Sequence, residues 1–143
     1  MKTKRNNRGF TLIELLIVMI ILGLLAALVA PRMFGKIGSS KQKTAKAQIS
    51  LFETALDTYR LDMGKYPPTE QGLLALRVKP SDNDNWDGPY LSKEIPNDPW
   101  KHPYEYRYPG EHGDYDIISY GADGQPGGDD EDTDVVSWKS IGQ

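Results

Sequence analysis

The feature that most constrains this chain is an almost uninterrupted apolar run near its N-terminus. Residues 10–30 contain only two polar members, Thr11 and Glu14, and sixteen consecutive apolar or small residues begin at Leu15. The core of a bilayer needs about 20 residues of helix, so residues 10–30 are predicted to form a helix that crosses a membrane. An acid at the centre of such a helix costs about 2.5–3.5 kcal/mol, and a simple anchor gives no reason for Glu14.

The nine residues before this run are basic and contain no acid: Lys2, Lys4, Arg5 and Arg8. The whole chain has 17 basic and 20 acidic residues and a net charge of −3, so the chain without these nine residues has 13 basic and 20 acidic residues and a net charge of −7. A basic arm beside an apolar run favours retention of the arm in the cytoplasm. The acidic remainder argues against nucleic-acid binding, which needs clustered Lys and Arg side chains.

A secretory signal peptide is a simpler interpretation of these thirty residues. Its apolar region is usually about 7–15 residues long, whereas here the run from residue 10 to residue 30 is longer. The best small residue for cleavage, Ala30, is followed directly by Pro31. Both details argue against removal of the whole apolar segment.

The stretch RGFTLIE, residues 8–14, resembles the processing site of type IV pilin-like proteins. The resemblance implies that a prepilin peptidase cleaves between Gly9 and Phe10, removes residues 1–9 as a leader and methylates the new N-terminal amine of Phe10. Cleavage there makes Glu14 the fifth residue of the mature chain. We expect Glu14 to pair with the Phe10 amine of a neighbouring subunit and to set the register of a filament, since a buried carboxylate left unpaired is costly.

The helical pattern continues beyond the apolar run. Apolar side chains recur at spacings of three and four residues, which places them on one helix face: Ile49, Phe52, Leu56, Tyr59 and Met63. Pro31 and the glycines of residues 35–38 are expected to kink or loosen the helix. Gly64 is expected to end it.

The remaining sequence predicts a small head built around a sheet. Alternating aromatic and charged residues over 104–108 predict one strand, residues 115–120 a second, and residues 135–140 a possible third. Thr69 is expected to cap a short helix that runs to about Leu76. The predicted fold class is α+β, with a long N-terminal helix, half transmembrane and half amphipathic, packed on a small antiparallel sheet.

Three stretches of the head, residues 66–76, 96–106 and 109–128, resemble the major pseudopilins of type II secretion systems. The resemblance implies a pilin-like head over residues 31–143. It also implies a function as the structural major subunit of a periplasmic pseudopilus, which polymerises to drive export of folded proteins across the outer membrane, and not as an enzyme. Lys101 departs from the family, which commonly has glycine there.

A type IV pilus subunit, from a surface or DNA-uptake filament, is the alternative. Adhesion pilins usually have a C-terminal cysteine pair, whereas this chain has no cysteine. The pseudopilin resemblance implies a single-pass protein of the inner membrane with its head in the periplasm. The implied partners are copies of the chain itself, the prepilin peptidase, minor pseudopilins and the inner-membrane assembly platform, with no nucleic acid.

The C-terminal part of the head contains an acidic, glycine-rich loop. Residues 114–134 contain eight acids and no base. Crowded carboxylates repel one another unless a cation lies among them, and Ca²⁺ takes six to eight oxygen ligands. The residues alone are equally consistent with a solvated acidic loop and with a calcium site. An EF-hand is excluded, because Val135 replaces the glycine that the pattern requires.

The pseudopilin resemblance implies that this loop binds Ca²⁺. Matching the family pattern gives three side-chain ligands, Asp123, Asp132 and Asp134, and two backbone carbonyls, those of Tyr120 and Gly128. The implied role of the ion is to hold the C-terminal loop on the sheet in place of a disulfide.

Other polar residues give little indication of chemistry. Asp129, Asp130 and Glu131 are expected to be charges at the rim of the loop and not ligands. His102 and His112 are isolated in the sequence and are expected to lie in turns or on the surface. No nucleophile or phosphate-binding motif is present, so the sequence predicts no catalytic residue.

Overall fold

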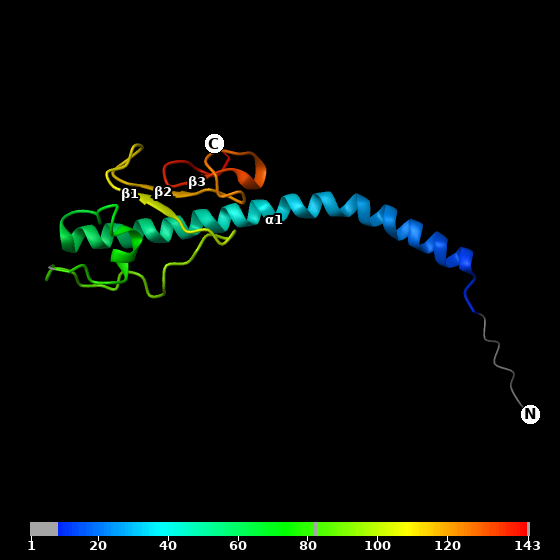
Figure 1. Ribbon diagram of the computed structural model, residues 1–143, viewed down its shortest axis with the longest axis horizontal. Helices are drawn as coiled ribbons and strands as arrows, with labels where there is room; N and C mark the ends of the chain where they lie inside the picture. Colours follow the sequence, from blue (N-terminus) through cyan, green and yellow to red (C-terminus); the bar gives the residue numbers. More distant parts are fainter. Residues whose placement is uncertain (1–8, 82, 143) are drawn as a thin grey trace, which may run out of the picture. The chain divides into compact units, whose positions relative to one another are not determined.

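The structure is a computed structural model that describes residues 9–81 and 83–142. The chain divides into two compact units, Met1–Lys36 and Ile37–Gln143. Along the chain, six elements follow one another (Figure 1): helix α1 (Leu12–Met63), the 3-10 helix η1 (Gly72–Leu76), strands β1 (Glu105–Arg107) and β2 (Asp116–Ser119), the 3-10 helix η2 (Asp130–Asp132) and strand β3 (Val135–Val136).

The second part of α1, from Ile37 to Met63, forms the centre of the head core, as the spacing of its apolar residues predicts. Ile49 and Leu56 are completely buried, and Phe52 and Tyr59 are each 2% exposed. The helix ends where predicted, because Gly64 has a φ of +76° and donates its backbone N–H to the Arg60 carbonyl at 2.8 Å. A residue without a Cβ adopts this left-handed conformation readily.

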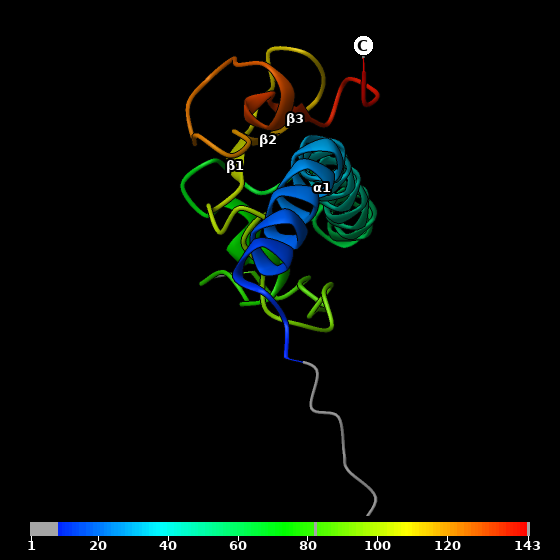
Figure 2. The same ribbon diagram turned by 90° about the vertical axis from the view of Figure 1, so that its right-hand side faces the viewer.

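The sheet has three antiparallel strands in the order β1-β2-β3. Tyr106 pairs with Ile117, and Ser119 pairs with Val135. The strands lie along the second part of α1 (Figure 1), and the view along the helix shows them on one side of it (Figure 2). The predicted α+β class, a long helix packed on a small antiparallel sheet, is therefore confirmed.

The tyrosines of the first predicted strand lie as its alternation indicates. Tyr106 is 6% exposed, whereas Glu105 and Arg107 are half-buried. The ring of Tyr104 packs edge-on against Phe52 with centroids 5.1 Å apart. Alternation along β1 thus separates the side chains that join the core from those that face the polar side of the sheet.

The expected cap of the short helix is wrong. The residue before η1 is Gln71, and no side chain caps this helix. Thr69 instead contacts Tyr108 at the end of β1: its hydroxyl donates to the Tyr108 carbonyl at 3.0 Å and accepts the Tyr108 N–H at 2.9 Å. The hydroxyl satisfies two backbone groups at the sheet edge, and this tertiary pairing displaces the local capping preference.

Candidate functional site

The first part of α1 presents its apolar side chains to the outside of the chain. Large apolar residues from Phe10 to Met33 are exposed by between 49% and 88%. Within the described residues, α1 is the one helix long and apolar enough to cross a membrane. A surface of this kind requires lipid or other protein around it.

Glu14 has a local partner in this segment. The Thr11 N–H donates to the Glu14 carboxylate at 3.0 Å, and the Glu14 N–H donates to the Thr11 hydroxyl at 3.3 Å. Since α1 begins at Leu12, this reciprocal pair is a capping box that satisfies two backbone donors at the helix start. The Thr-x-x-Glu spacing in the sequence could have predicted it.

The proposed cleavage point lies just before α1. Gly9 and Phe10 are both outside the helix and exposed, with Phe10 86% exposed. The remainder of the predicted leader, residues 1–8, lies outside the residues that the structure describes.

Two glycines draw the acidic loop between β2 and β3 tightly around Asp132. Gly121 and Gly128 have φ values of +65° and +98°, and a Cβ at either would lie 2.7 Å from atoms of Asp132. The Ala122 N–H also donates to the Glu131 carbonyl at 2.9 Å. The glycines therefore let two stretches of the loop approach more closely than other residues would allow.

The three candidate side-chain ligands differ in their surroundings. Asp134 accepts the Gly127 N–H on Oδ2 at 2.9 Å, while its Oδ1 is buried and has no hydrogen-bond partner. Asp132 is half-buried, and the exposed Asp123 accepts the Gln125 N–H at 3.0 Å. A buried carboxylate oxygen without a donor is unfavourable, and a cation would satisfy it, so Asp134 fits a metal ligand.

The structure does not bring these three carboxylates into one cluster. Across residues 9–81 and 83–142, no group of three Asp, Glu or His side chains lies close enough to hold a metal ion. The carbonyl of Gly128 lies 3.5 Å from the Thr133 hydroxyl, which donates to it. Of the predicted rim charges, Asp129 and Asp130 are exposed, whereas Glu131 is half-buried.

The loop contacts α1 through three helix residues spaced four apart. Gly38 is buried, and a Cβ there would collide with the Glu131 side chain. Gln42 donates to the Asp130 carbonyl at 2.5 Å. Lys46 donates to two carbonyls at the end of β3, those of Val136 in the strand at 2.7 Å and of the next residue, Ser137, at 3.0 Å. Residues four apart share one helix face, so this face anchors both η2 and the C-terminal end of β3.

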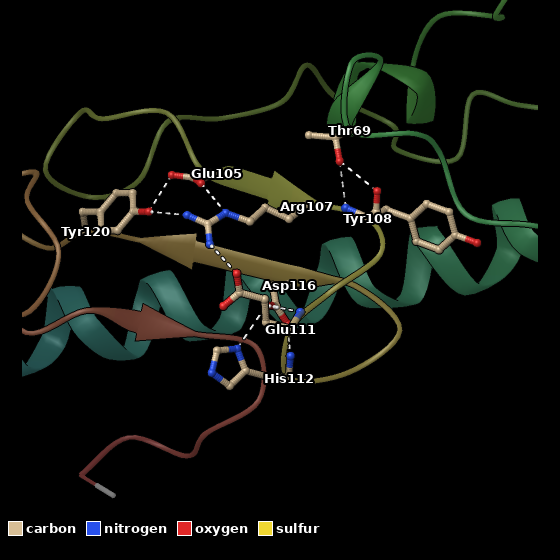
Figure 3. Close-up of polar contacts among 8 residues, drawn as sticks. All are labelled: Thr69, Glu105, Arg107, Tyr108, Glu111, His112, Asp116 and Tyr120. Carbon is tan, nitrogen blue, oxygen red and sulfur yellow. Dashed lines mark hydrogen bonds and ion pairs between the residues drawn. The ribbon is translucent and has the colours of Figure 1, made fainter.

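Tyr120, whose carbonyl is a candidate ligand, has its side chain fixed on the polar side of the sheet (Figure 3). Its hydroxyl donates to Glu105 at 2.5 Å, and Arg107 donates to Glu105 at 2.6 Å. The hydrogen bond from Tyr120, and with it the nearby Arg107 guanidinium, outweighs partial burial and lowers the pKa of Glu105. A charged Glu105 therefore anchors the end of β2 from which the loop departs.

His112 lies in the turn between β1 and β2 and joins that turn to the C-terminal segment. Its ring stacks on Trp138 with centroids 3.8 Å apart, and its Nδ1 lies 3.0 Å from the buried Asp116 carboxylate (Figure 3). Burial acts to raise the pKa of Asp116, but hydrogen bonds from the His112 ring and from the Glu111 and His112 backbone hold it below its ordinary value. A carboxylate buried at the start of the central strand is thus kept charged.

Sequence reasoning missed the part that His102 plays. The His102 ring contacts the turn after β2, with Nδ1 3.1 Å from the Gly121 carbonyl. The His112 ring is paired with the Asp116 carboxylate, whereas the His102 ring is bonded to a backbone carbonyl. The hollows around Leu74, around Leu51 and beside Val136 contain no histidine and at most one acid in each lining.

Both segments of the chain match known families. Residues 32–138 match the family described as type II secretion system protein G. Residues 4–30 match the family described as the prokaryotic N-terminal methylation motif. The head and the apolar segment are therefore recognised separately.

Proteins of similar sequence have one shared description. The type II secretion system core protein G of Pseudomonas aeruginosa is 46% identical over 138 residues, which cover 94% of this chain and 97% of that protein. The protein of the same name from Vibrio cholerae is 43% identical over 141 residues, 96% of each chain. A crystal structure of the major pseudopilin from the type 2 secretion system of enterohaemorrhagic Escherichia coli superimposes with a TM-score of 0.63 and 37% identity, over 76% of this chain and 95% of the other.

Proposed function

Because this chain belongs to the type II secretion system protein G family, we propose that it is the repeating subunit of a pseudopilus. In this proposal, copies of the chain polymerise through their apolar helices, and the growing filament drives folded proteins across the outer membrane. The subunit acts by assembly and not as an enzyme.

The contrast along α1 carries the proposal. The same helix buries Ile49 and Leu56 completely in its own head, yet leaves its apolar side chains up to Met33 exposed. Lipid can cover this surface before assembly, and the same surface of other subunits can cover it afterwards. The same apolar surface is thus covered both in the membrane and in a bundle of identical helices, without any change in the head.

Processing of the N-terminus precedes assembly in the proposed sequence of events. A prepilin peptidase removes residues 1–9, and Phe10 becomes a methylated N-terminal residue. Glu14 then has two competing partners, the Thr11 N–H of its own helix and the Phe10 amine of a neighbour. The pairing with the neighbour sets the register, because a mispaired carboxylate in the dry bundle is penalised.

The proposed location follows from the charges and the apolar segment. The basic residues before the segment favour a cytoplasmic N-terminus, so the chain crosses the inner membrane once and its head lies in the periplasm. The proposed partners beyond the chain itself are the inner-membrane assembly platform and the minor pseudopilins.

A calcium ion in the C-terminal loop is a further part of the proposal. Asp123, Asp132 and Asp134 would hold it with the carbonyls of Tyr120 and Gly128, and the bound ion would supply positive charge shared among their oxygens. The buried, unpaired Oδ1 of Asp134 supports this assignment. Since the three side chains do not form a ready cluster, binding is coupled to further ordering of the loop.

Deletion of the gene tests the function directly. The expected result is accumulation of folded exoproteins in the periplasm and their loss from the medium, with surface pili unchanged by electron microscopy. Complementation with the parent chain should restore secretion, and complementation with Glu14→Ala should not. Loss of surface pili with normal secretion would instead identify a pilus subunit.

A further inference from the structure

The turn that precedes β1 is held rigidly by one buried carboxylate. Asp98 is 3% exposed and accepts the backbone N–H groups of Trp100 at 3.0 Å and His102 at 2.8 Å. Its second oxygen accepts the hydroxyl of Ser119 on β2 at 2.6 Å. The Asp98 N–H also donates to the His102 carbonyl at 2.8 Å. The backbone of His102 is therefore fixed relative to the central strand of the sheet.

From this fixed backbone, the His102 ring reaches the turn that opens the acidic loop. Its Nδ1 lies 3.1 Å from the Gly121 carbonyl. A carbonyl only accepts hydrogen bonds, so Nδ1 carries the proton and donates. The ring also lies against Gly124, where a Cβ would be 3.3 Å from the imidazole.

These two contacts bracket one of the candidate ligands. Gly121 and Gly124 have φ values of +65° and +66°, so the turn has little conformational restriction of its own. Asp123 lies between them and is exposed. The His102 imidazole, which lies outside the loop, bonds the Gly121 carbonyl.

We propose that His102 is a positioning residue that orders residues 121–124 before the cation binds, and thereby strengthens binding through Asp123. The inference rests on the calcium part of the proposed function. His102 is proposed to act through the backbone and not as a ligand, because its Nδ1 is already bonded to the Gly121 carbonyl.

The physical consequence is a lower ordering cost on binding. A turn with two glycines in the left-handed region gains much backbone entropy when it disorders, so it is ordered only where other contacts hold it. Without His102, the turn keeps the hydrogen bond from the Ala122 N–H to the Glu131 carbonyl but loses its contact with the rigid backbone of His102. Calcium must then supply that part of the ordering, and the cost subtracts from its affinity. Loss of one hydrogen bond of ordinary strength corresponds to a Kd increased about fivefold.

Three variants of the full chain in detergent micelles separate positioning from general stability. His102→Ala removes the donor and the ring. His102→Asn keeps an N–H donor near the position of Nδ1. His112→Ala is the control, since it removes the other histidine, whose ring contacts Trp138 and Asp116 and not this turn.

Two readouts are measured on each variant: the Kd for calcium chloride by titration calorimetry, and amide hydrogen exchange of residues 121–125 without calcium. We expect His102→Ala to increase the Kd about fivefold and to speed exchange in the turn. His102→Asn should have a Kd and exchange rates close to those of the parent, and His112→Ala should leave both readouts unchanged.

Unchanged Kd and exchange in His102→Ala would overturn the inference. A parent chain that binds no calcium would overturn the calcium proposal, and the exchange data alone would then decide whether His102 orders the turn. If His102→Ala does not fold, ring NMR shifts of the parent decide: a proton on Nδ1 supports the inference, and a proton on Nε2 overturns it.

Discussion

The two parts of α1 differ in where they place their largest apolar side chains. In the second part, Phe52 and Tyr59 are each 2% exposed because the sheet and loops of the same chain cover them. In the first part, Leu16 and Leu22 are 58% and 59% exposed. The head thus covers one apolar face of its own helix segment, whereas the apolar side chains of the N-terminal segment need lipid or other protein to cover them.

This difference teaches that stability and assembly are separable properties of the molecule. Changes in the second part of α1 should act on unfolding of the head. Changes in the first part should act on membrane insertion and filament formation, while the head stays folded.

The largest effect is expected from a charge in the exposed part. Leu22→Lys places an ammonium group near the middle of the apolar segment, at a cost of about 2.5–3.5 kcal/mol on insertion, and an unpaired charge in a helix bundle adds to it. Filaments and exoprotein secretion should both fall to background. The melting temperature of the head should remain that of the parent, as should all properties of the control Leu22→Ile.

A cavity in the buried part should lower the stability of the head, which the charge in the exposed part leaves unchanged. Leu56→Ala removes a completely buried side chain and should lower the free energy of unfolding by about 2–5 kcal/mol, measured by chemical denaturation in detergent. The matched change Leu16→Ala should leave the unfolding of the head unaltered. Equal destabilisation by the two variants would contradict the separation.

Removal of calcium should destabilise the head without touching the exposed part. A ligand present at 100 times its Kd stabilises a protein by about 2.7 kcal/mol, so a chelator should lower the melting temperature by several degrees. Asp134→Asn should abolish that response, and Asp129→Asn at the exposed rim should retain it. An unchanged melting temperature of the parent after addition of the chelator would refute the calcium site.

Acid should weaken the sheet through Asp116. Its folded-state pKa is lowered, so its contribution is present above the unfolded pKa of about 4 and is lost as the pH falls through the lower folded value. Hydrogen bonds to a charged group correspond to about 1.5–3 kcal/mol. Urea denaturation between pH 2 and pH 6 should show a smaller loss in Asp116→Asn, and an unaltered profile in the exposed Glu111→Gln.

The smallest effect concerns the backbone strain at Lys101. Lys101 has a φ of +73°, a conformation that costs residues with a Cβ about 1–2 kcal/mol. Lys101→Gly should therefore raise the free energy of unfolding by about 0.5–1 kcal/mol after the entropy of glycine is subtracted. Lys101→Ala should give no gain, and a gain in both variants would assign the effect to charge.

Periodic features of the sequence predicted their structures well. The three-and-four spacing of Ile49, Phe52 and Leu56 placed them in the core, and the alternation around Tyr106 separated the two sides of β1. Gly64 ended α1 as expected. Such features depend on local geometry and on burial of one face, and both are visible in a single stretch of sequence.

Features decided by distant contacts were not predictable in this way. Every residue of β2 is buried, so alternation could not separate Asp116 from its apolar neighbours. Thr69 meets Tyr108 across 39 positions of chain, and His102 meets Gly121 across 19. The positive φ of Lys101 has no local signal in the sequence, because the residue there is lysine and not glycine.

The most direct test of the account is photo-crosslinking in intact cells. A photoreactive phenylalanine derivative at Ile17, in the exposed part of α1, should give a ladder of covalent multimers of this chain. The same group at Tyr59, buried in the head, should give none, although the variant must first be shown to fold. A ladder from Ile17 alone is the predicted result, and monomers at Ile17 under conditions of active secretion would contradict assembly through this segment.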